Sequence, residues 1–213
     1  MGVVGVLPAS GSAFRIRGLP KFCFPVNDTE TAIEWHIRSM ESVCDEIIVT
    51  TRTMWLPILK SLDLGNKVTI KCVEPSTMSS VVASVATDST TRYVVGLPDT
   101  YVKDSDDFYS AIASDTALLS LALFDCPLEL RGRVGQVLTN EKNVLDVVDK
   151  DPSCSYTKMW GAFSFSGIKF NPKLIHPGFE FNDLRSSGIA FYNASGAYYD
   201  LGSYQGLKEF YSQ

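Results

Sequence analysis

Strand-like and helix-like segments alternate along the first half of this chain, and that alternation restricts its fold more than any other feature. Short runs rich in β-branched residues occupy Val3–Pro8, Glu46–Thr51, residues 67–73 and residues 93–97. Between them, apolar residues recur at helical spacing over residues 29–43, 55–62 and 76–86. Strands that alternate with helices form βαβ units, which build a mainly parallel sheet. We therefore predict an α/β fold.

The second half of the chain has a different pattern. A helix is predicted over residues 105–112, followed by strands over 117–124, 132–138, 144–148 and 162–168 and a short helix over 207–211. The polar stretch 140–143 is typical of a hairpin turn. Asn27 or Thr29 is the predicted N-cap of the helix at 29–43, and Ser76 or Thr77 that of the helix at 76–86. No linker separates the halves, so we expect one domain over residues 1–213.

Charge and composition argue against several classes of protein. The net charge is −5, from 19 basic and 24 acidic residues, and no basic block marks a nucleic-acid or anionic membrane surface. No apolar run is long enough to span a bilayer. The five cysteines have no C-x-x-C spacing and only two histidines occur, which argues against a zinc site or a disulfide framework. We expect a soluble, cytoplasmic protein with free thiols.

A loop of small residues after the first strand predicts an anion-binding site. The loop contains, in order, Ala9, Ser10, Gly11, Ser12 and Ala13. Two cations, Arg15 and Lys21, follow it. Small residues let backbone N–H groups approach an anion closely, and the cations neutralise its charge. Ligands of parallel sheets bind at the carboxyl ends of the strands, where this loop and the Pro98-Asp99 turn are both expected. The pattern therefore predicts a polyphosphate cradle.

Five motifs in order resemble those of the sugar-phosphate nucleotidylyltransferases. They are the loop at 9–15 with Pro20-Lys21 and Phe24-Pro25-Val26, the segment 76–81, the strand end Gly96-Leu97-Pro98-Asp99-Thr100, the segment 133–137 with Asp149-Lys150-Asp151-Pro152, and the segment 198–207. Ala13 and Phe14 stand where the family has a glycine and a hydroxyl residue. The resemblance covers essentially the whole chain. It implies a Rossmann-like (GT-A-like) three-layer sandwich with a mainly parallel, mixed central sheet.

The resemblance also implies a reaction. A nucleotidyl group passes from a nucleoside triphosphate to a sugar-1-phosphate, and pyrophosphate leaves. Mg²⁺, which prefers hard oxygen ligands, would be held by Asp99 and Asp200. Arg15 would bind the β- and γ-phosphates, and Lys21 would neutralise charge at the α-phosphate or at the attacking phosphate. No general base is required, because a sugar phosphate is already an anionic nucleophile.

The resemblance assigns two halves and their residues. Residues 1–115 form a nucleotide-binding half with Leu7, Ala9, Ser10, Gly11, Ser12, Ala13, Arg15, Lys21, Ser76, Thr77, Ser79, Ser80 and Asp99. Residues 116–213 form a sugar-phosphate-binding half with Gly135, Asp149, Lys150 and Gly161. Arg15, Lys21 and Asp99 are the expected catalytic residues. The resemblance is also compatible with a homodimer.

Alternative interpretations remain open beside this one. The acceptor is a non-sugar phosphate in related enzymes, and the weak match at Asp149-Lys150 favours that reading. A non-catalytic descendant that binds nucleotide and regulates is a third hypothesis, favoured by the lost glycines. Asp149 and Lys150 either contact the sugar or only form an ion pair with each other on a hairpin. Trp160 is a core residue or a platform for the sugar, and His36 is predicted to be a packed core histidine on the apolar face of its helix.

Overall fold

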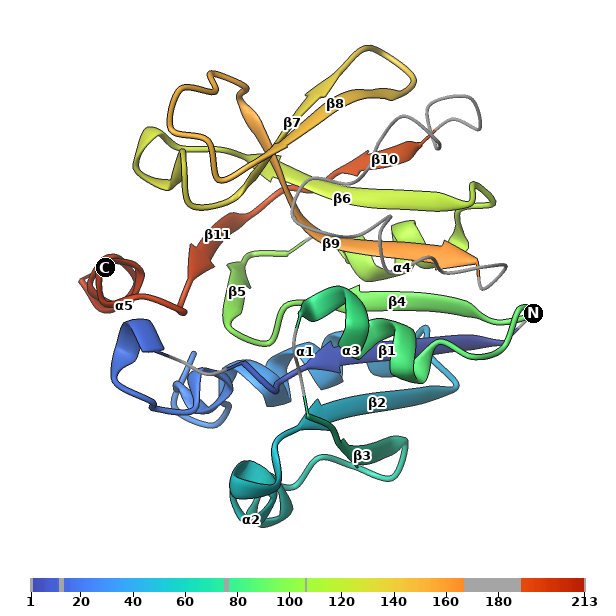
Figure 1. Ribbon diagram of the computed structural model, residues 1–213, viewed down its shortest axis with the longest axis vertical. Coiled ribbons are helices and arrows are strands. Elements are labelled where there is room, and N and C mark those ends of the chain that lie inside the picture. Colours follow the sequence, from blue (N-terminus) through green and yellow to red (C-terminus); the bar gives the residue numbers. More distant parts are fainter. Residues whose placement is uncertain (1, 12–13, 75–76, 106, 167–188, 213) are drawn as a thin grey trace.

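The computed structural model describes residues 2–11, 14–74, 77–105, 107–166 and 189–212, and a nine-stranded sheet runs through its centre (Figure 1). Seven of its strands lie in the order β10-β6-β9-β4-β1-β2-β3. Their bounds are Ala190–Asn193 (β10), Leu119–Asp125 (β6), Lys158–Ser166 (β9), Arg92–Gly96 (β4), Val3–Pro8 (β1), Glu46–Thr51 (β2) and Val68–Cys72 (β3). The hairpin of β7 (Gly135–Thr139) and β8 (Val144–Asp149) joins the sheet through β9. Strands from both halves of the chain therefore share one sheet.

Most strands of this sheet run in the same direction. β1 pairs in parallel with β2 and β4, β2 with β3, and β6 with β10. β9 is antiparallel to β4, β6 and β7, and β8 is antiparallel to β7. Only β8 and β9 therefore run against the other described strands of the sheet. The predicted mainly parallel, mixed sheet is confirmed.

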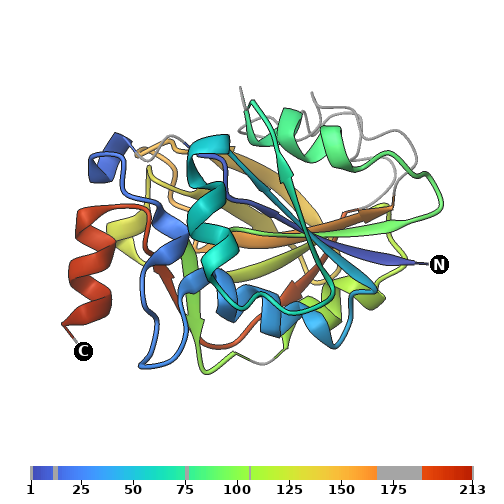
Figure 2. The same cartoon turned by 90° about the horizontal axis from the view of Figure 1, so that it is seen from below.

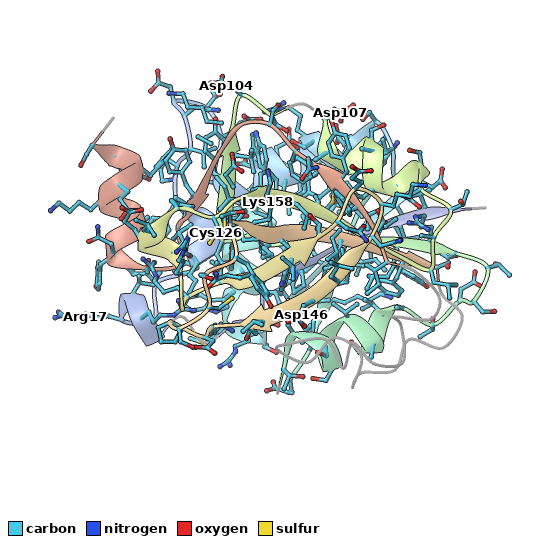
Figure 3. All side chains as sticks on the ribbon, turned by 90° about the horizontal axis from the view of Figure 1, so that it is seen from above. Arg17, Asp104, Asp107, Cys126, Asp146 and Lys158 are labelled. Atoms are coloured by element: carbon cyan, nitrogen blue, oxygen red, sulfur yellow. The ribbon has the colours of Figure 1, made fainter. Side chains whose placement is uncertain are left out.

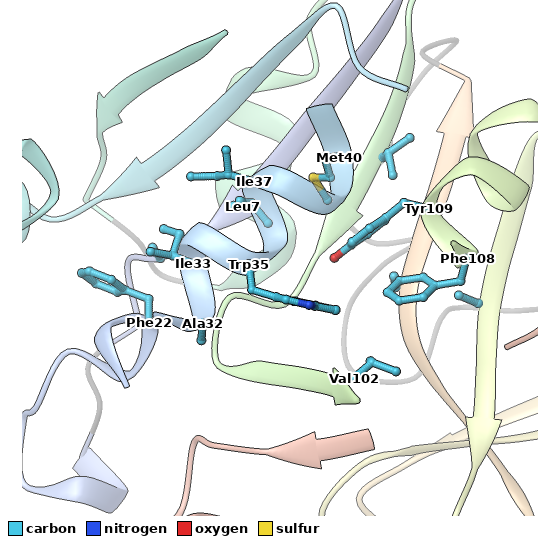
Figure 4. Close-up of a cluster of buried hydrophobic side chains, with 14 of the residues drawn as sticks. Leu7, Phe22, Ala32, Ile33, Trp35, Ile37, Met40, Val102, Phe108 and Tyr109 are labelled. Carbon is cyan, nitrogen blue, oxygen red and sulfur yellow. The ribbon is translucent and has the colours of Figure 1, made fainter. Parts of the chain in front are cut away.

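Helices cover both faces of the sheet, which makes three layers (Figure 2). Helices α1 (Ala32–Glu41) and α4 (Phe108–Ser114) pack on one face, and α3 (Met78–Val85) packs on the other. The alternation of side chains along a strand explains the two cores. Leu7 of β1 packs with α1 and Val6 with α3, and both are fully buried. Figure 4 shows the first core, where the α1 side chains meet Leu7 and Tyr109.

The start of α1 differs from the prediction. The helix begins at Ala32, and its N-cap is Thr31 rather than Asn27 or Thr29. Asn27 instead closes a turn, in which its Oδ1 accepts hydrogen bonds from the backbone N–H groups of Thr29 and Glu30 at 2.9 and 2.8 Å. The Thr31 backbone N–H and hydroxyl both donate to the Glu34 carboxylate, at 2.8 and 2.7 Å. The predicted N-cap of this helix is therefore wrong by two to four residues. For α3, one of the two predicted N-caps, Thr77, is confirmed.

A second, two-stranded sheet lies outside the large one and was not predicted. β5 (Thr100–Lys103) pairs antiparallel with β11 (Ala197–Asp200), and Thr100 faces Asp200 in the register. Helix α5 (Tyr204–Tyr211) covers this sheet, with the Phe210 ring 5.4 Å from Tyr101 and 5.3 Å from Tyr199. The small sheet joins residues from the two halves of the chain at one end of the molecule (Figure 1).

The boundaries of other helices and strands differ from the predicted ones by a few residues. α2 spans Leu56–Ser61, α4 begins at Phe108 instead of residue 105, and β9 begins four residues before the predicted strand at 162. Short 3-10 turns occupy Phe14–Ile16 (η1), Lys21–Cys23 (η2), Thr53–Trp55 (η3) and Leu128–Leu130 (η4). Among the described helices, none has the length and apolar character needed to cross a membrane.

Candidate active site

The carboxyl ends of β1, β2 and β4 meet at one edge of the sheet, and the loops after them form the site. Two hydrogen bonds hold the loop after β1 against the last residues of β2 and the residue that follows them. The Ala9 backbone N–H donates to the Thr50 carbonyl at 2.8 Å, and Arg52 Nε donates to the Ser10 carbonyl at 2.9 Å. The small-residue loop is therefore anchored where a parallel sheet places its ligands.

Two adjacent pockets open at this edge. One, of about 60 Å³, lies between Ala9, Lys21 and Asp99. The other, of about 280 Å³, lies between Ser10, Thr77 and Asp99. Pro8, Gly11, Pro98 and Asp99 line both. The fold thus brings together candidate nucleotide-binding residues from three segments that are far apart in the sequence.

Lys21 and Asp99 form an ion pair between the two pockets. Lys21 Nζ donates to Asp99 Oδ2 at 3.0 Å, and the two side chains are 16% and 33% exposed. Lys21 sits in η2, and Asp99 sits in the turn that connects β4 to β5. The expected cation and the expected metal carboxylate are therefore in direct contact.

Asp200 reaches the same point through the small sheet. β11 places Asp200 opposite Thr100, and the Leu201 backbone N–H donates to the Asp99 carbonyl at 2.9 Å. A Cβ atom built on Gly202 would lie 2.6 Å from Asp99 Oδ2, 2.9 Å from Asp200 Oδ1 and 3.0 Å from Lys21 Nζ. Two carboxylates and an ammonium group therefore converge on the space that a glycine leaves free.

Arg133 holds Asp200 from the other side. Its Nη2 donates to Asp200 Oδ2 at 2.7 Å and also contacts the Ser203 hydroxyl. The Gly202 backbone N–H donates to Asp200 Oδ1 at 2.9 Å. The motif over residues 133–137 predicts no role for Arg133. The geometry makes it the residue that orients this carboxylate.

The residues present fit a magnesium ion. Asp99 and Asp200 supply hard oxygen atoms at one point, as Mg²⁺ requires. Within the described residues no cluster of three or more histidine, cysteine, aspartate or glutamate side chains occurs. Mg²⁺ usually binds through one or two carboxylates and takes its other ligands from phosphate oxygens and water. Two converging carboxylates beside a pocket match this usual coordination of Mg²⁺.

The solved structures that this chain resembles include sugar-phosphate nucleotidylyltransferases. A protein from Bacillus anthracis described as a glucose-1-phosphate thymidylyltransferase, in complex with a sucrose, matches with a TM-score of 0.81, 15% identity, and coverage of 99% of this chain and 94% of its own. A UDP-glucose pyrophosphorylase complexed with UDP-glucose matches with a TM-score of 0.78, 16% identity, and coverage of 100% and 98%. This chain has the fold of the sugar-phosphate nucleotidylyltransferases. No family model matches the sequence, and no curated protein matches it.

A third structure with the nucleotidylyltransferase fold is a UDP-glucose pyrophosphorylase from Acinetobacter baumannii, with a TM-score of 0.76, 19% identity, and coverage of 99% of this chain and 92% of its own. The Rossmann-like architecture predicted from the motifs is confirmed. At this low identity the similarity shows the fold and does not identify the substrates.

Several of the predicted nucleotide-binding residues have structural roles in this nucleotidylyltransferase fold. Leu7 is fully buried in the core, and Ser79 is buried in α3. Thr77 Oγ1 accepts a hydrogen bond from the Ser80 backbone N–H at 3.1 Å, and the Thr77 N–H donates to Ser80 Oγ at 3.1 Å. The segment 77–80 thus shapes the start of α3 as well as lining the larger pocket.

Arg15 takes no part in the ion pairs of the site. It is exposed in η1 and forms no ion pair with any residue that the structure describes. Arg17, just after η1, projects at the outer edge of the molecule (Figure 3). Ser12, Ala13 and Ser76 lie outside the described residues. The structure therefore brings Lys21, Asp99 and Asp200 together and leaves Arg15 exposed to solvent.

The predicted sugar-phosphate residues lie on the β7–β9 side of the nucleotidylyltransferase fold. Gly135 faces Asp149 in the β7–β8 register, and a Cβ on Gly135 would lie 2.0 Å from Trp160 Nε1. Asp149 and Lys150 form an ion pair of 3.1 Å, with side chains 9% and 55% exposed. Trp160 is half-buried and packs on Phe163, with ring centroids 5.9 Å apart. Gly135 therefore makes room for the tryptophan ring.

Gly161 has a comparable packing role. A Cβ on this residue would lie 2.6 Å from the rings of both Phe124 and Tyr198. Tyr198 precedes Asp200 by two residues in β11. The absence of a side chain at Gly161 therefore leaves room for the Tyr198 ring, which supports the strand that carries Asp200. Burial, reinforced by the nearby Asp200 and Asp99 carboxylates, raises the pKa of Tyr198 above its usual value.

A buried histidine supports the turn that carries Asp99. His36 is 1% exposed, which confirms the predicted core histidine. Its Nε2 lies 3.0 Å from the Thr100 carbonyl and its Nδ1 lies 2.6 Å from the Tyr109 hydroxyl. A carbonyl only accepts, so Nε2 carries the proton and Nδ1 accepts from Tyr109. Burial lowers the pKa of His36 to about 4, so the ring stays neutral at physiological pH.

Proposed function

We propose that this protein transfers a nucleotidyl group from a nucleoside triphosphate to a sugar-1-phosphate and releases pyrophosphate. The observation that carries the proposal is the convergence of Lys21, Asp99 and Asp200 on the space at Gly202, beside two pockets at the carboxyl edge of the sheet. This convergence joins motifs from the start, the middle and the end of the chain. The nucleotidylyltransferase fold of the solved structures adds support.

The proposed chemistry is an in-line displacement at phosphorus. A phosphate oxygen of the sugar-1-phosphate forms a bond to the α-phosphorus, and the bond from that phosphorus to the bridging oxygen of the β-phosphate breaks. The electron pair leaves with pyrophosphate. Because negative charge crowds at one centre, catalysis rests on positioning and charge neutralisation. No proton has to be removed from the nucleophile.

The residues divide these tasks. Asp99 and Asp200 would hold Mg²⁺, which would neutralise phosphate charge. Lys21 places its ammonium group at the pocket wall, where an α-phosphate or an attacking phosphate meets it. Arg133 fixes the orientation of Asp200. Arg15, exposed in η1, is available to bind the β- and γ-phosphates of an incoming nucleotide.

In this proposal the sugar phosphate binds on the β7–β9 side, near Gly135, Asp149, Lys150 and Gly161. The ion pair between Asp149 and Lys150 favours a second candidate, transfer to a non-sugar phosphate. Its carboxylate already has a cationic partner, which leaves it less free to accept hydrogen bonds from sugar hydroxyls. Polyol phosphates and phosphocholine therefore belong among the acceptors tested.

Release of pyrophosphate tests the proposal. The protein is incubated with Mg²⁺, each of the five common nucleoside triphosphates in turn and a pool of sugar-1-phosphates. Asp99→Asn and Lys21→Ala are expected to lower turnover by at least about 100-fold, the effect of removing one transition-state donor. Asp125→Asn is the matched control, because Asp125 forms an ion pair with Lys158 and is 91% exposed. It should leave turnover unchanged.

The outcomes separate the candidates. Pyrophosphate released with sugar-1-phosphates supports the first proposal, and release only with other phosphates supports the second. Nucleotide binding without pyrophosphate from any acceptor supports a regulatory binder. Turnover by Asp99→Asn and Lys21→Ala within a few-fold of the wild type would show that the assigned roles are wrong.

A further inference from the structure

Arg52 stands in the wall of the larger pocket, and no role has been assigned to it. It follows β2 directly and begins the η3 turn. It lines the pocket of about 280 Å³ together with Ser10 and Thr77. It does not line the smaller pocket, which contains Lys21. The arginine therefore shares its pocket with Asp99 but not with Lys21.

One edge of the Arg52 guanidinium is fixed and the other is free. Nε donates to the Ser10 carbonyl at 2.9 Å, which anchors the side chain to the loop after β1. Its two Nη groups form no hydrogen bond or ion pair with any residue in the described part of the chain. The residue is half-buried. A planar fork of N–H donors, held at one atom, is thus presented to the pocket.

The chemistry of the other walls indicates what binds there. Met78, Val81 and Leu97 supply apolar surface to the same pocket. Apolar walls suit the face of a flat ring and not a phosphate group, whose charge Lys21 is placed to meet. A few polar groups in a mainly apolar pocket fix the orientation of the ligand and give specificity. The larger pocket therefore has the character of a nucleobase site.

An arginine fork selects among bases by their hydrogen-bonding edges. It contains donors only, so it needs two adjacent acceptors. Guanine offers O6 and N7, and cytosine offers O2 and N3. Adenine places an amino donor beside N7, and uracil and thymine place an N–H between their two carbonyls. Of the five bases, only guanine and cytosine therefore offer two adjacent acceptor atoms, one for each Nη group.

We propose that Arg52, anchored through Nε to Ser10, selects guanine or cytosine as the base of the nucleotide substrate. This inference deepens the proposed function, because it names the substrate class of the same site. It depends on nucleotide binding and not on turnover.

Equilibrium binding of GTP, CTP, UTP, dTTP and ATP tests it, measured by calorimetry on the wild type and on Arg52→Lys and Arg52→Gln. We expect the wild type to bind GTP or CTP about ten- to a hundred-fold more tightly than UTP, the discrimination that one bidentate pair provides. The GTP and CTP arms decide between the two bases. Arg52→Lys keeps the charge and loses the fork, so it should remove the preference while leaving the Kd for UTP nearly unchanged.

Arg38→Lys is the matched control, because Arg38 on α1 pairs with Glu30 and the Arg38 side chain is 58% exposed. It should preserve the preference. Equal weakening of all five nucleotides by Arg52→Lys and Arg52→Gln would indicate a phosphate contact and overturn the proposal. A wild-type preference for UTP, dTTP or ATP, or none at all, would also overturn it. If both variants fail to fold, the wild-type panel alone can still overturn the proposal.

These results are independent of the reaction itself. Tight, selective binding of GTP or CTP without pyrophosphate release with any acceptor would refute the proposed function and leave the role of Arg52 standing. Pyrophosphate release that depends on UTP or dTTP would support the proposed function and refute the role of Arg52.

Discussion

At the scale of single residues, Gly202 is the position on which the candidate site depends. Its φ lies outside the left-handed region, so backbone freedom does not explain the glycine. The reason is space, because a methyl group there would overlap Asp99 Oδ2 and Asp200 Oδ1. A side chain at this position would force apart the two carboxylates that are expected to share one Mg²⁺.

Gly202→Ala is therefore expected to lower kcat by about 10- to 100-fold, since displacements of about 1 Å at a reacting centre cost this much. The free energy of unfolding should change little, because the displaced side chains are partly exposed. The measurement is pyrophosphate release at saturating substrates, with urea unfolding alongside. Gly2→Ala is the control, because its new Cβ would lie 3.6 Å from the nearest atom. Wild-type kcat in Gly202→Ala would show that the two carboxylates need not converge.

Some residues of the candidate site can be predicted from the sequence, and others cannot, for a physical reason. Lys21, Asp99 and Asp200 were predicted from local motifs, and the structure brings them together. Arg52 and Arg133 were given no role, because each acts through a partner far away in the chain, 42 positions for Arg52 and 67 for Arg133. A lone arginine outside a small-residue loop carries no local signal, and only the fold shows its partner.

At the scale of elements, the long strands and helices were predictable and the short ones were not. β1, β2 and β4 carry continuous apolar or β-branched runs that are typical of the buried strands of a parallel sheet. β5 and β11 are four residues each, and their pairing joins segments about a hundred residues apart. Nothing local distinguishes such a strand from a loop, so the small sheet that positions Asp200 appears only in the folded chain.

The N-terminus of α1 provides an element-scale prediction. Thr31→Ala removes the hydroxyl that donates to the Glu34 carboxylate at 2.7 Å. The free energy of unfolding is expected to fall by about 1 kcal/mol, as for other N-cap replacements, and kcat should remain unchanged. Urea unfolding measures the first quantity and pyrophosphate release the second. Thr157→Ala, an exposed threonine whose hydroxyl forms no hydrogen bond with the described residues, should have no effect. An equal loss in both variants would argue against capping by Thr31.

At the scale of the whole molecule, a neutral histidine lies inside the core that supports the site. Burial lowers the pKa of His36 to about 4 in the folded state, whereas an exposed histidine has a pKa near 6.5. The unfolded chain therefore takes up the proton first as the pH falls. This difference in proton uptake leaves the free energy of unfolding unchanged above pH 6.5 and lowers it progressively as the pH falls from 6.5 to 4.

The expected loss from His36 over this range is about 3 kcal/mol of unfolding free energy. His36→Gln cannot titrate, so the difference in stability between the wild type and this variant should be constant above pH 6.5. Below it, the wild type should lose its advantage. Urea unfolding at a series of pH values measures the difference, in which contributions from the carboxylates cancel. A difference independent of pH would show that His36 titrates alike in both states.

The small sheet of β5 and β11 also has a consequence for biosynthesis. Translation delivers Lys21 and Asp99 early, and strands β1 to β4 can pair while the ribosome is still adding the second half of the chain. Asp200 lies in β11, the last of the described strands, which pairs with a segment made about a hundred residues earlier. A nascent chain therefore lacks the second carboxylate of the centre until β11 has been synthesised.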